Sequence, residues 1–580
     1  MKFCPKCGSR LKLGRRGTSC PNCGSMGPSK VALADFFPFG AMRPFQREIL
    51  DKLEAEIAAR RKYIILEAPV GFGKSAVAAA LCRYMGSAYI LTSTKQLQDQ
   101  YASDFGFRVV KGKSNFQCLV PTSSGLQVPC NKGRCEVDWR LSDCPHYLTF
   151  EQFDEHKKHR CDRESKCEHG NRLCPYYEQK WTAFRTAVAV CNYPFFLSEL
   201  KYTDELPHRK LLVCDEVHDL EKQLVGFASF SLRRSTLESY GEGVPPEKTA
   251  IPDRGLEDPS AWLDTLKDKI GIFDDFCEAH LDDGDAQDRV ASAKSSLESL
   301  EGFTESLKTN PENWVVNKVK KSPDGLVEEV VFQPINVGGY VGPLLSTADT
   351  VLMMSATVFS KDLLCTTVGL DPAEVSFIKV SESVFPVSNR PIYAMNVAQL
   401  NRANLEASLD GIARAVDEIM DRHSNERGVI HTTSYQQVNL IMSRVSEKNR
   451  ARLITTDGGF ERSVLLQIHG ATGASVLISP SLFQGVDLKD ELSRFQVVVK
   501  VPYPDLSERR TRVKLERDRG WYDWQTALRL VQTYGRSVRS ETDHAVTYVL
   551  DSNFTRFVGE QKGMFPSYFL EAVKPGVEAK

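Results

Sequence analysis

The stretch from Tyr63 to Ser75 constrains the fold more than any other part of the chain. It begins with apolar residues, continues into a glycine-containing turn, and is followed by the small-residue run 76–81. That order predicts a strand, a loop and a helix. Such a loop wraps its backbone N–H groups around phosphates, and the N-terminus of the helix adds partial positive charge. The positions that match a phosphate loop are Gly71, Gly73, Lys74 and Ser75, with Ala68 at the place usually held by the first glycine.

Lys74 and Ser75 predict a site for a nucleoside triphosphate with Mg²⁺. The lysine ammonium would reach the β- and γ-phosphates, and the serine hydroxyl would bind the metal. A strand-to-helix turn without a ligand is the alternative. An acidic group farther along the chain favours the nucleotide site, because an apolar run ends in Asp215, Glu216 and His218. Asp215 would hold Mg²⁺, Glu216 would activate the attacking water, and His218 would couple the site to a second domain.

Composition is that of a globular protein with several domains. The 580 residues predict about four domains, and 42% apolar with 26% charged residues is typical of a soluble chain. No run of about 18 apolar residues exists, and the first residues lack the apolar core of a signal peptide, so we expect a cytoplasmic protein with no membrane contact. Because the net charge is −1, any nucleic-acid site must be a local patch.

Cysteine is concentrated near the N-terminus, where 12 of the 16 cysteines lie between residues 4 and 174. This clustering favours metal ligation in a reducing compartment over a disulfide framework. The first four cysteines form two C-x2-C pairs, namely Cys4, Cys7, Cys20 and Cys23. Four thiolates at such spacing suit tetrahedral Zn²⁺. Residues 1–30 therefore resemble a zinc ribbon, in which the metal supplies the folding energy.

A second cysteine group opens at Cys118, behind the run Lys-Gly-Lys-Ser-Asn, and closes at Cys174, which begins a Cys-Pro-Tyr step. In these features the sequence resembles the iron–sulfur helicases of the XPD, Rad3 and DinG group. The resemblance implies a [4Fe–4S] cluster, with the predicted ligands Cys118, Cys161, Cys167 and Cys174. The alternatives for the two middle ligands are Cys130, Cys135 and Cys144. Cysteines left over would be buried thiols or a second, zinc-like site with His146.

Further motifs of this group follow in order along the chain. Arg43 and Gln46 look like a segment that contacts adenine ahead of the phosphate loop. Hydroxyl-rich turns at 92–98 and 431–434 follow predicted strands, so their side chains would lie at the ligand edge of a parallel sheet and hold a nucleic-acid backbone. Residues 355–357, Ser-Ala-Thr, resemble the tripeptide that links ATP hydrolysis to strand movement in the family.

The closing motifs lie in a second predicted motor domain. Gly485 and Asp487 resemble the family's Gly-x-Asp step, although a Gln stands where the family usually has Glu. Gln532, Arg536 and Arg539 follow, and the two arginines, three positions apart, would project from one helix face. Set across a cleft, these arginines would neutralise charge that develops on the γ-phosphate. Two solvated helix arginines are the alternative, which the upstream lysine and acids disfavour.

Strands that alternate with helices predict an α/β fold with parallel sheets. The resemblance implies a superfamily 2 helicase with two RecA-like motor domains. Two amphipathic stretches at 261–278 and 286–307 predict helices, either of a spacer or, as the resemblance implies, of an inserted arch domain. The predicted limits are 1–30 for the zinc ribbon, 31–110 with 185–224 and 336–385 for the first motor domain, 111–184 for the iron–sulfur insert, 225–335 for the helical arch and 386–580 for the second motor domain.

The function that these motifs predict is an ATP-dependent DNA helicase that moves along single-stranded DNA and unwinds duplexes. The resemblance, and nothing in the spacing of residues, implies DNA and 5′-to-3′ travel. The expected cofactors are ATP, Mg²⁺, a [4Fe–4S] cluster and Zn²⁺. Single-stranded and forked DNA and a protein loading partner are the expected partners of a monomeric motor. A translocase or remodeller that does not unwind, or an RNA helicase, is the alternative, whereas intact Lys74, Glu216 and Arg536 disfavour a non-enzymatic clamp.

Overall fold

The computed structural model describes most of the chain from residue 32 onward and two short strands before it. The described residues are 12–14, 17–19, 32–121, 125–133, 135, 141, 144–158, 173–203, 205–241, 243–253, 257–280, 287–383, 385–400, 404–455, 462–480, 488, 490–538 and 542–576. The two early strands, β1 (Lys12–Gly14) and β2 (Gly17–Ser19), pair antiparallel between the two C-x2-C pairs.

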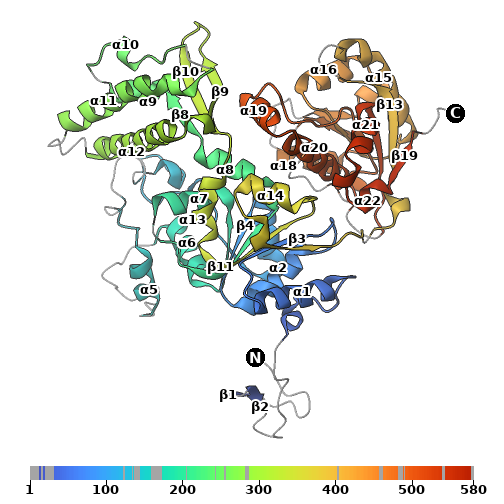
Figure 1. The fold of residues 1–580 in the computed structure, drawn as a ribbon, viewed down its shortest axis with the longest axis horizontal. Helices are drawn as coiled ribbons and strands as arrows, with labels where there is room; N and C mark the ends of the chain where they lie inside the picture. The colour runs from blue at the N-terminus through green and yellow to red at the C-terminus, as the bar shows by residue number, and fades with distance from the viewer. Residues whose placement is uncertain are drawn as a thin grey trace.

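The first large sheet has seven parallel strands in the order β12-β3-β11-β7-β4-β6-β5. Figure 1 labels β3, β4 and β11 of this sheet. Its strands are β3 (Tyr63–Glu67), β4 (Ala88–Thr92), β5 (Arg108–Val109), β6 (Val188–Asn192), β7 (Arg209–Asp215), β11 (Ala348–Ser355) and β12 (Val375–Lys379). The inner strands are near-continuous apolar runs because both faces of the sheet are covered there. One face packs against α1 (Gln46–Ala58), α2 (Lys74–Met85) and α3 (Lys95–Phe105). The other packs against α6 (Pro175–Arg185), α7 (Tyr193–Tyr202), α8 (Leu220–Ala228), α13 (Gly338–Leu345) and α14 (Lys361–Val368).

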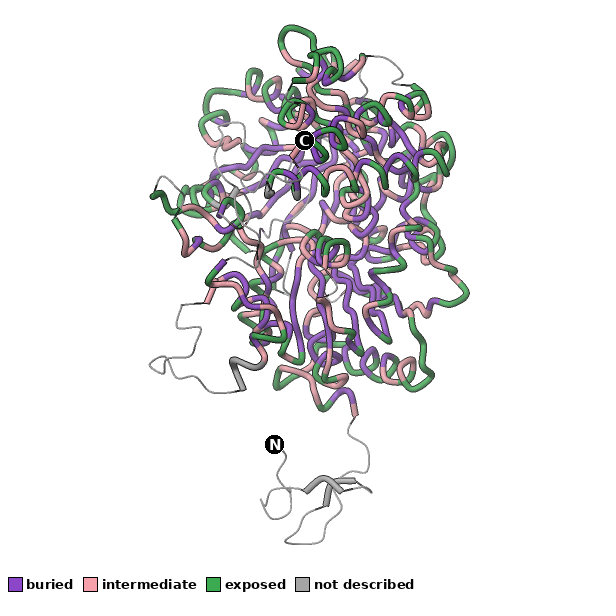
Figure 2. The backbone as a smooth tube through the Cα atoms, turned by 90° about the vertical axis from the view of Figure 1, so that its left-hand side faces the viewer, coloured by how far each residue is buried: buried purple, intermediate pink, exposed green. Residues whose placement is uncertain are grey.

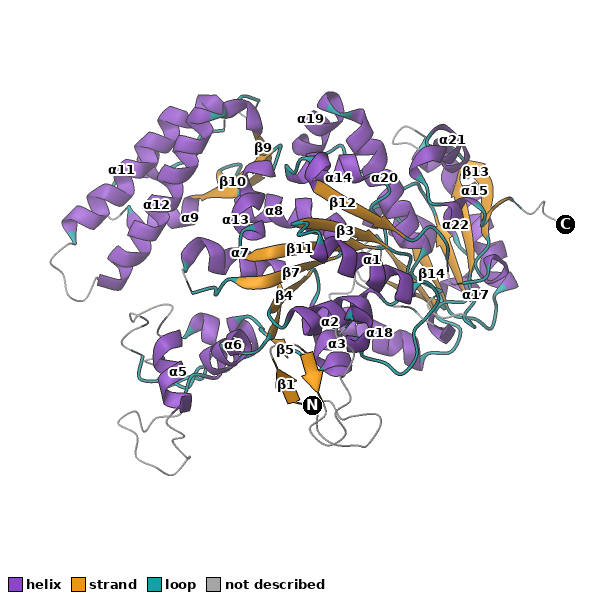
Figure 3. Cartoon of the chain, turned by 60° about the horizontal axis from the view of Figure 1, so that its bottom comes forward, coloured by secondary structure: helices purple, strands orange, loops and turns teal. Residues whose placement is uncertain are grey.

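The second large sheet also has seven parallel strands, in the order β15-β16-β14-β17-β18-β13-β19. Its strands are β13 (Ile392–Ala398), β14 (Gly428–His431), β15 (Leu453–Thr455), β16 (Val476–Ser479), β17 (Phe495–Val498), β18 (Val546–Asp551) and β19 (Val573–Pro575). Its helices are α15 (Leu405–Arg422), α16 (Tyr435–Arg444), α17 (Glu447–Arg450), α18 (Arg462–Ala471), α19 (Arg509–Arg517), α20 (Arg519–Tyr534), α21 (Asn553–Glu560) and α22 (Ser567–Leu570). Two parallel α/β sheets flanked by helices confirm the predicted fold class (Figure 3). We call the two units the first and the second lobe.

Between β5 and β6 the chain leaves the first sheet to form the cysteine-rich insert. The described part of the insert contains α5 (Phe150–Lys158) and leads into α6. Its interior is aromatic, with Trp181 fully buried and its indole N–H donating to Leu148 O at 2.8 Å. Aromatic side chains supply much of the buried area that so short an insert can gather.

A third unit at 230–334 contains a sheet that the sequence analysis did not predict. The expected helices are present as α11 (Leu263–Ala279) and α12 (Gln287–Thr309), with the shorter α9 (Arg234–Tyr240) and α10 (Pro246–Thr249). The α9, α11 and α12 helices pack on an antiparallel sheet of β8 (Phe230–Arg233), β10 (Val327–Pro334) and β9 (Trp314–Lys321), in that order. The Pro-Asp-Gly turn before Leu326 is the signal that could have revealed the hairpin.

Burial follows this division into units. Figure 2 shows the buried residues along the interior of the molecule and the exposed residues on peripheral helices and turns. The α19 helix of the second lobe contacts β9 of the third unit, and the two lie next to each other at the top of the molecule in Figure 1. Among the described residues, no helix combines the length and the apolar character that crossing a bilayer would require.

Candidate functional site

The phosphate loop joins β3 to α2, which begins at Lys74. Gly71 and Gly73 adopt left-handed backbone conformations, with φ of 82° and 87°, in which a residue with a Cβ would be strained. Space is a second constraint, since a Cβ at Gly73 would lie 2.6 Å from Gln46 Nε2. The Lys74 ammonium donates to Ala68 O at 3.0 Å, so the side chain lies back over the loop. These contacts explain why the loop needs glycine at both positions.

Arg43 and Gln46 bind the backbone of the same loop. Gln46 is buried at the start of α1, where Nε2 donates to Phe72 O at 2.7 Å and Oε1 accepts from the Arg43 backbone N–H at 2.8 Å. The exposed Arg43 guanidinium donates to Gly71 O. The two residues therefore brace the loop, and their contact with adenine stays a prediction.

The acidic pair lies at the carboxyl end of β7, beside the loop. Asp215 is buried, and its carboxylate accepts from Tyr101 Oη at 2.9 Å and from the Glu216 backbone N–H at 2.9 Å. Burial, and then the charge of Glu216, raises the pKa of Asp215 to about 7, while Lys74 opposes the shift. The Ser75 hydroxyl also interacts with Tyr101. Carboxylate and hydroxyl oxygens are hard donors of the kind that Mg²⁺ takes, so these residues fit the predicted ion.

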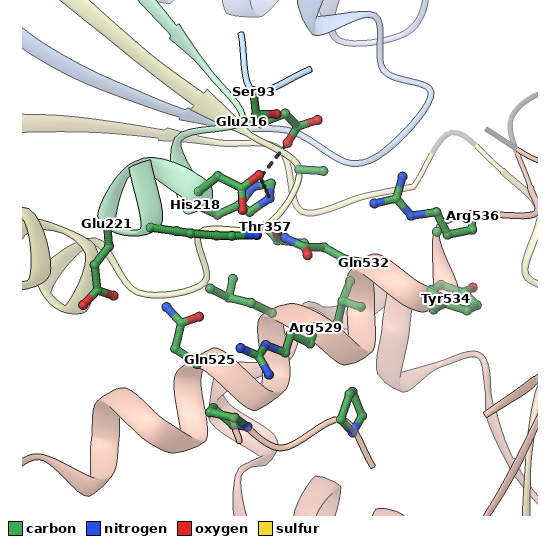
Figure 4. Close-up of a pocket in the computed structure, with 18 of the residues that line it drawn as sticks. Ser93, Glu216, His218, Glu221, Thr357, Gln525, Arg529, Gln532, Tyr534 and Arg536 are labelled. Carbon is green, nitrogen blue, oxygen red and sulfur yellow. Dashed lines mark hydrogen bonds and ion pairs between the residues drawn. The ribbon is translucent and has the colours of Figure 1, made fainter. Parts of the chain in front are cut away.

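A chain of polar contacts runs from the acidic pair to the second lobe. His218 Nδ1 lies 3.2 Å from Glu216 Oε2 and 2.8 Å from Ser355 Oγ. Ser355 Oγ lies 3.4 Å from Thr357 Oγ1, and Gln532 Nε2 of α20 donates to Thr357 Oγ1 at 3.2 Å. Figure 4 shows Glu216, His218, Thr357 and Gln532 in this sequence across the gap between the lobes. The contacts therefore connect the predicted water-activating acid with α20.

Arg536 lies at the same junction but not on a helix. The α20 helix ends at Tyr534, and Gly535 caps it, so the prediction that Arg536 projects from a helix face is wrong. Gly535 follows the last helical residue, and glycine lowers the stability of a helix interior, so the helix does not extend to Arg536. Gly535 packs against the phosphate loop, since a Cβ there would lie 3.1 Å from Val70 Cγ2. Figure 4 shows Arg536 facing the cleft.

The lobes enclose a cleft of about 1130 Å³ to which both contribute. Glu216 and Arg536 line it, as do hydroxyl side chains at the ends of strands of both sheets, which are Ser93, Thr94 and Thr433. The structure thus brings the two predicted hydroxyl-rich turns to one cavity. The remaining predicted residues of this site, Gly485, Asp487 and Arg539, lie outside the described residues.

Sequence reasoning missed a buried ionic contact between the lobes. Glu221 of α8 accepts from Arg510 Nη2 at 2.6 Å and from Trp521 Nε1 at 2.8 Å, and Lys514 Nζ lies 3.2 Å away. Burial by itself would raise the pKa of Glu221, but the two cations outweigh it and hold the pKa below its usual value. Arg510 also donates to Pro334 O at the end of β10. Three units therefore meet around Arg510.

Phe385 is a second residue that no motif indicated. It lies between β12 and β13, where the chain crosses from one sheet to the other, and its ring is buried with Val538 and Ala545. A Cβ at Gly71 would lie 2.0 Å from Phe385 Cζ, so the ring rests directly on the phosphate loop. The crossing between the lobes is thereby in contact with the predicted nucleotide site.

The insert brings two of the four predicted cluster ligands to a single cavity, together with the three alternatives for the middle pair. Its lining includes the sulfur-bearing residues Cys118, Cys130, Cys135, Cys144 and Cys174, together with His146. Thiolates are the usual ligands of iron–sulfur clusters, so the donor set fits one. No group of three or more His, Cys, Asp or Glu residues in the described ranges is arranged around a single metal ion. The predicted ligands Cys161 and Cys167, and the zinc-ribbon cysteines Cys4, Cys7, Cys20 and Cys23, lie outside those ranges.

The thiols in this cavity differ in their electrostatic surroundings. A hydrogen bond from Cys135, opposed by burial, lowers the pKa of Cys144 to about 6. Burial raises the pKa of Cys130 to about 12 and also raises that of Cys174. Cys118 is fixed by the backbone, since its N–H donates to Val128 O at 2.9 Å. Cys135 and Cys144 form one hydrogen-bonded pair, and Cys130 and Cys174 form another.

Comparison with known proteins gives matches over most of the chain. Residues 418–571 match a helicase C-terminal domain, and residues 40–240 match the type III restriction enzyme, res subunit. A probable ATP-dependent helicase of Methanocaldococcus jannaschii is 21% identical over 639 residues, covering 91% of this chain and 94% of its own. An XPD helicase structure has a TM-score of 0.61 at 16% identity, covering 93% of this chain and 100% of its own. Xpd4 of S. tokodaii has a TM-score of 0.57 at 17% identity, covering 92% and 100%.

Proposed function

We propose that this chain, which has the fold of the XPD helicases and matches a helicase C-terminal domain, is an ATP-dependent helicase. The finer proposal is that it moves 5′ to 3′ along single-stranded DNA and unwinds duplex DNA. One observation supports the ATP-driven motor above the others: Val70 of the phosphate loop, Glu216 and Arg536 line one cleft between two parallel-sheet lobes. ATP hydrolysis between two such lobes can drive them together and apart.

Each group of the proposed nucleotide site has a separate task in hydrolysis. Lys74 binds the β- and γ-phosphates, and the backbone N–H groups of the loop hold the phosphate chain. Asp215 and Ser75 would hold Mg²⁺, which neutralises charge on the phosphates. Glu216 takes the proton of the attacking water. Arg536 donates to the γ-phosphate from the opposite lobe as charge develops there.

The conformational change that accompanies ATP hydrolysis would be transmitted to the nucleic acid through contacts at the same junction. A change at Glu216 alters its contact with His218, and the contacts through Ser355 and Thr357 end on Gln532 of α20. The hydroxyl groups of the strand-end turns would hold the phosphates of one strand, without reading its sequence. Closing and opening of the cleft would then shift those turns along the strand.

A strand-displacement assay on tailed duplexes tests this function. With ATP, the chain is expected to displace a strand from a 5′-tailed DNA duplex but not from a 3′-tailed one, and Lys74→Ala is expected to displace none. ATP hydrolysis that single-stranded DNA stimulates without any displacement would favour a translocase. Stimulation by RNA alone would favour an RNA helicase, and a wild-type chain without ATP hydrolysis would contradict the proposal.

The metal centres belong to the same proposal. A [4Fe–4S] cluster would be held by Cys118, Cys174 and two further cysteines of the insert. The support is the single cavity that Cys118 and Cys174 share with Cys130, Cys135 and Cys144. A bound cluster would brace the insert by tying its distant segments together. Zn²⁺ would be held by the four N-terminal cysteines, whose spacing is the support for that site.

Cys174→Ser is expected to remove the cluster but to leave the motor intact. Protein prepared without oxygen should fall from about four iron atoms per chain to below one, and lose its brown absorbance and its unwinding. Much of the ATP hydrolysis should remain, because the insert contributes no residue to the phosphate loop. Cys277→Ser, which changes a buried thiol in the third unit, should keep its iron. Wild-type protein without iron would contradict the cluster.

Matched serine variants identify the middle ligands. Cys161→Ser should lose iron if the prediction from the family resemblance is right, whereas Cys144→Ser should lose it if Cys144 of the cavity lining is a ligand. The iron content of each variant decides between the two sets.

A further inference from the structure

Tyr101 is a buried phenol that no motif of the nucleotide site includes. Its side chain comes from α3 and has no exposed surface. The hydroxyl donates to Asp215 Oδ2 at 2.9 Å and also interacts with the Ser75 hydroxyl. Asp215 lies on β7 and Ser75 on α2, so one phenol connects two elements that are far apart in the sequence. The proposed function assigns the binding of Mg²⁺ to these same two side chains, Asp215 and Ser75.

The contact fixes the orientation of the Asp215 carboxylate. Oδ1 accepts from the Glu216 backbone N–H at 2.9 Å, and Oδ2 accepts from Tyr101. With each oxygen held by one donor, the carboxylate cannot rotate without losing a hydrogen bond inside a buried site. A carboxylate has about four lone-pair positions, so acceptor capacity remains for a metal ion or its water.

The phenol itself is held rigidly. Thr94 caps α3 by accepting from the Leu97 N–H at 3.3 Å, and Gly106 ends the helix in a left-handed conformation. The Tyr101 ring lies in the apolar core of the first lobe, and its centroid is 5.7 Å from that of Phe105. Because the ring is fixed, its hydroxyl donates toward the carboxyl end of β7, where Asp215 lies at the proposed metal site.

We propose that Tyr101 is a positioning residue of the divalent-cation site, holding Asp215 and Ser75 in the arrangement that binds the cation of a metal–nucleotide complex. The proposal rests on the proposed nucleotide site and adds a residue to it. Tyr101 does not touch the nucleotide. It acts through Asp215 and Ser75, in the way that outer groups orient the ligands of metal sites generally.

Tyr101→Phe tests the role because it removes the hydroxyl and keeps the buried ring. Affinity for a fluorescent ADP analogue should fall about tenfold in Mg²⁺ and stay within about twofold of wild type in EDTA. The Mg²⁺ concentration that half-saturates ATP hydrolysis should rise by about the same tenfold factor. A purely structural loss would weaken binding with and without metal alike, so the EDTA measurement also reports whether the variant is folded.

Tyr89→Phe is the matched control. Tyr89 is equally buried, on β4, and its hydroxyl donates to Pro207 O at 2.9 Å and not to Asp215. It should bind the ADP analogue as wild type does in both buffers. Equal loss for Tyr101→Phe in Mg²⁺ and EDTA, or no loss in either, would overturn the positioning role. A wild-type chain that binds Mg²⁺-ADP but hydrolyses no ATP would overturn the proposed function and leave this comparison valid.

Discussion

A variant in which Arg536 is replaced by alanine is expected to hydrolyse ATP about 1,000-fold more slowly than the wild-type chain. The guanidinium faces the cleft from the second lobe, and the residue before it packs on Val70 of the phosphate loop. Its positive charge would stabilise the negative charge that develops as the γ-phosphate departs. The loss of activity should therefore appear in kcat, with KM within about threefold of wild type. Steady-state hydrolysis at saturating single-stranded DNA measures both constants.

Two further variants sharpen this result. Arg536→Lys keeps a charge but loses the planar fork, so its kcat should lie between those of wild type and the alanine variant. Arg414→Ala removes an exposed arginine from α15 of the same lobe and should leave kcat unchanged. If Arg536→Ala kept more than about a tenth of wild-type kcat, the arginine would have no part in stabilising the transition state.

The parts of the site that follow local rules could be predicted from the sequence. Gly71 and Gly73 have the positive φ that a phosphate loop requires, and α2 begins at Lys74. Asp215 follows an apolar strand, and the carboxyl ends of parallel strands share one edge of a sheet. Strand, loop and helix could be predicted here because a few neighbouring residues determine each of them.

Contacts between distant segments could not be predicted in this way. The pairing of β9 with β10 was missed because the charged residues of both strands obscure the alternation of apolar residues. The Phe385 ring contacts the phosphate loop at Gly71 although more than half the chain separates the two residues, and no local sequence pattern predicts that contact. Arg536 was placed on a helix because spacing alone favours one, whereas Gly535 ends α20 just before it. Tyr101 carries no motif, and only the fold brings its hydroxyl to Asp215.

The second large effect is expected at Glu221, where the lobes are joined through a buried carboxylate. Its side chain is 7% exposed, and those of Arg510 and Lys514 are 10% and 8% exposed. Glu221→Ala would leave two buried cations without their anion and the Trp521 N–H without its acceptor. Removing one member of a buried ionic group costs about 3–5 kcal/mol, because the remaining charge stays desolvated. The unfolding midpoint should therefore fall by about 10 °C in calorimetry, at about 2–4 °C per kcal/mol.

A surface pair and a conservative variant separate this effect from a general loss of charge. Glu305→Ala breaks the exposed pair between Lys308 and Glu305, 3.3 Å apart, and should shift the midpoint by no more than about 2 °C. Glu221→Gln loses the charge and keeps one acceptor oxygen, which can serve either Arg510 or Trp521 but not both, so its midpoint should lie between those of wild type and Glu221→Ala. Because Glu221 holds the second lobe against the first, Glu221→Ala should also expose the region between α8 and α19 to proteolysis. An unchanged midpoint and cleavage pattern would mean that the lobes are held together without this carboxylate.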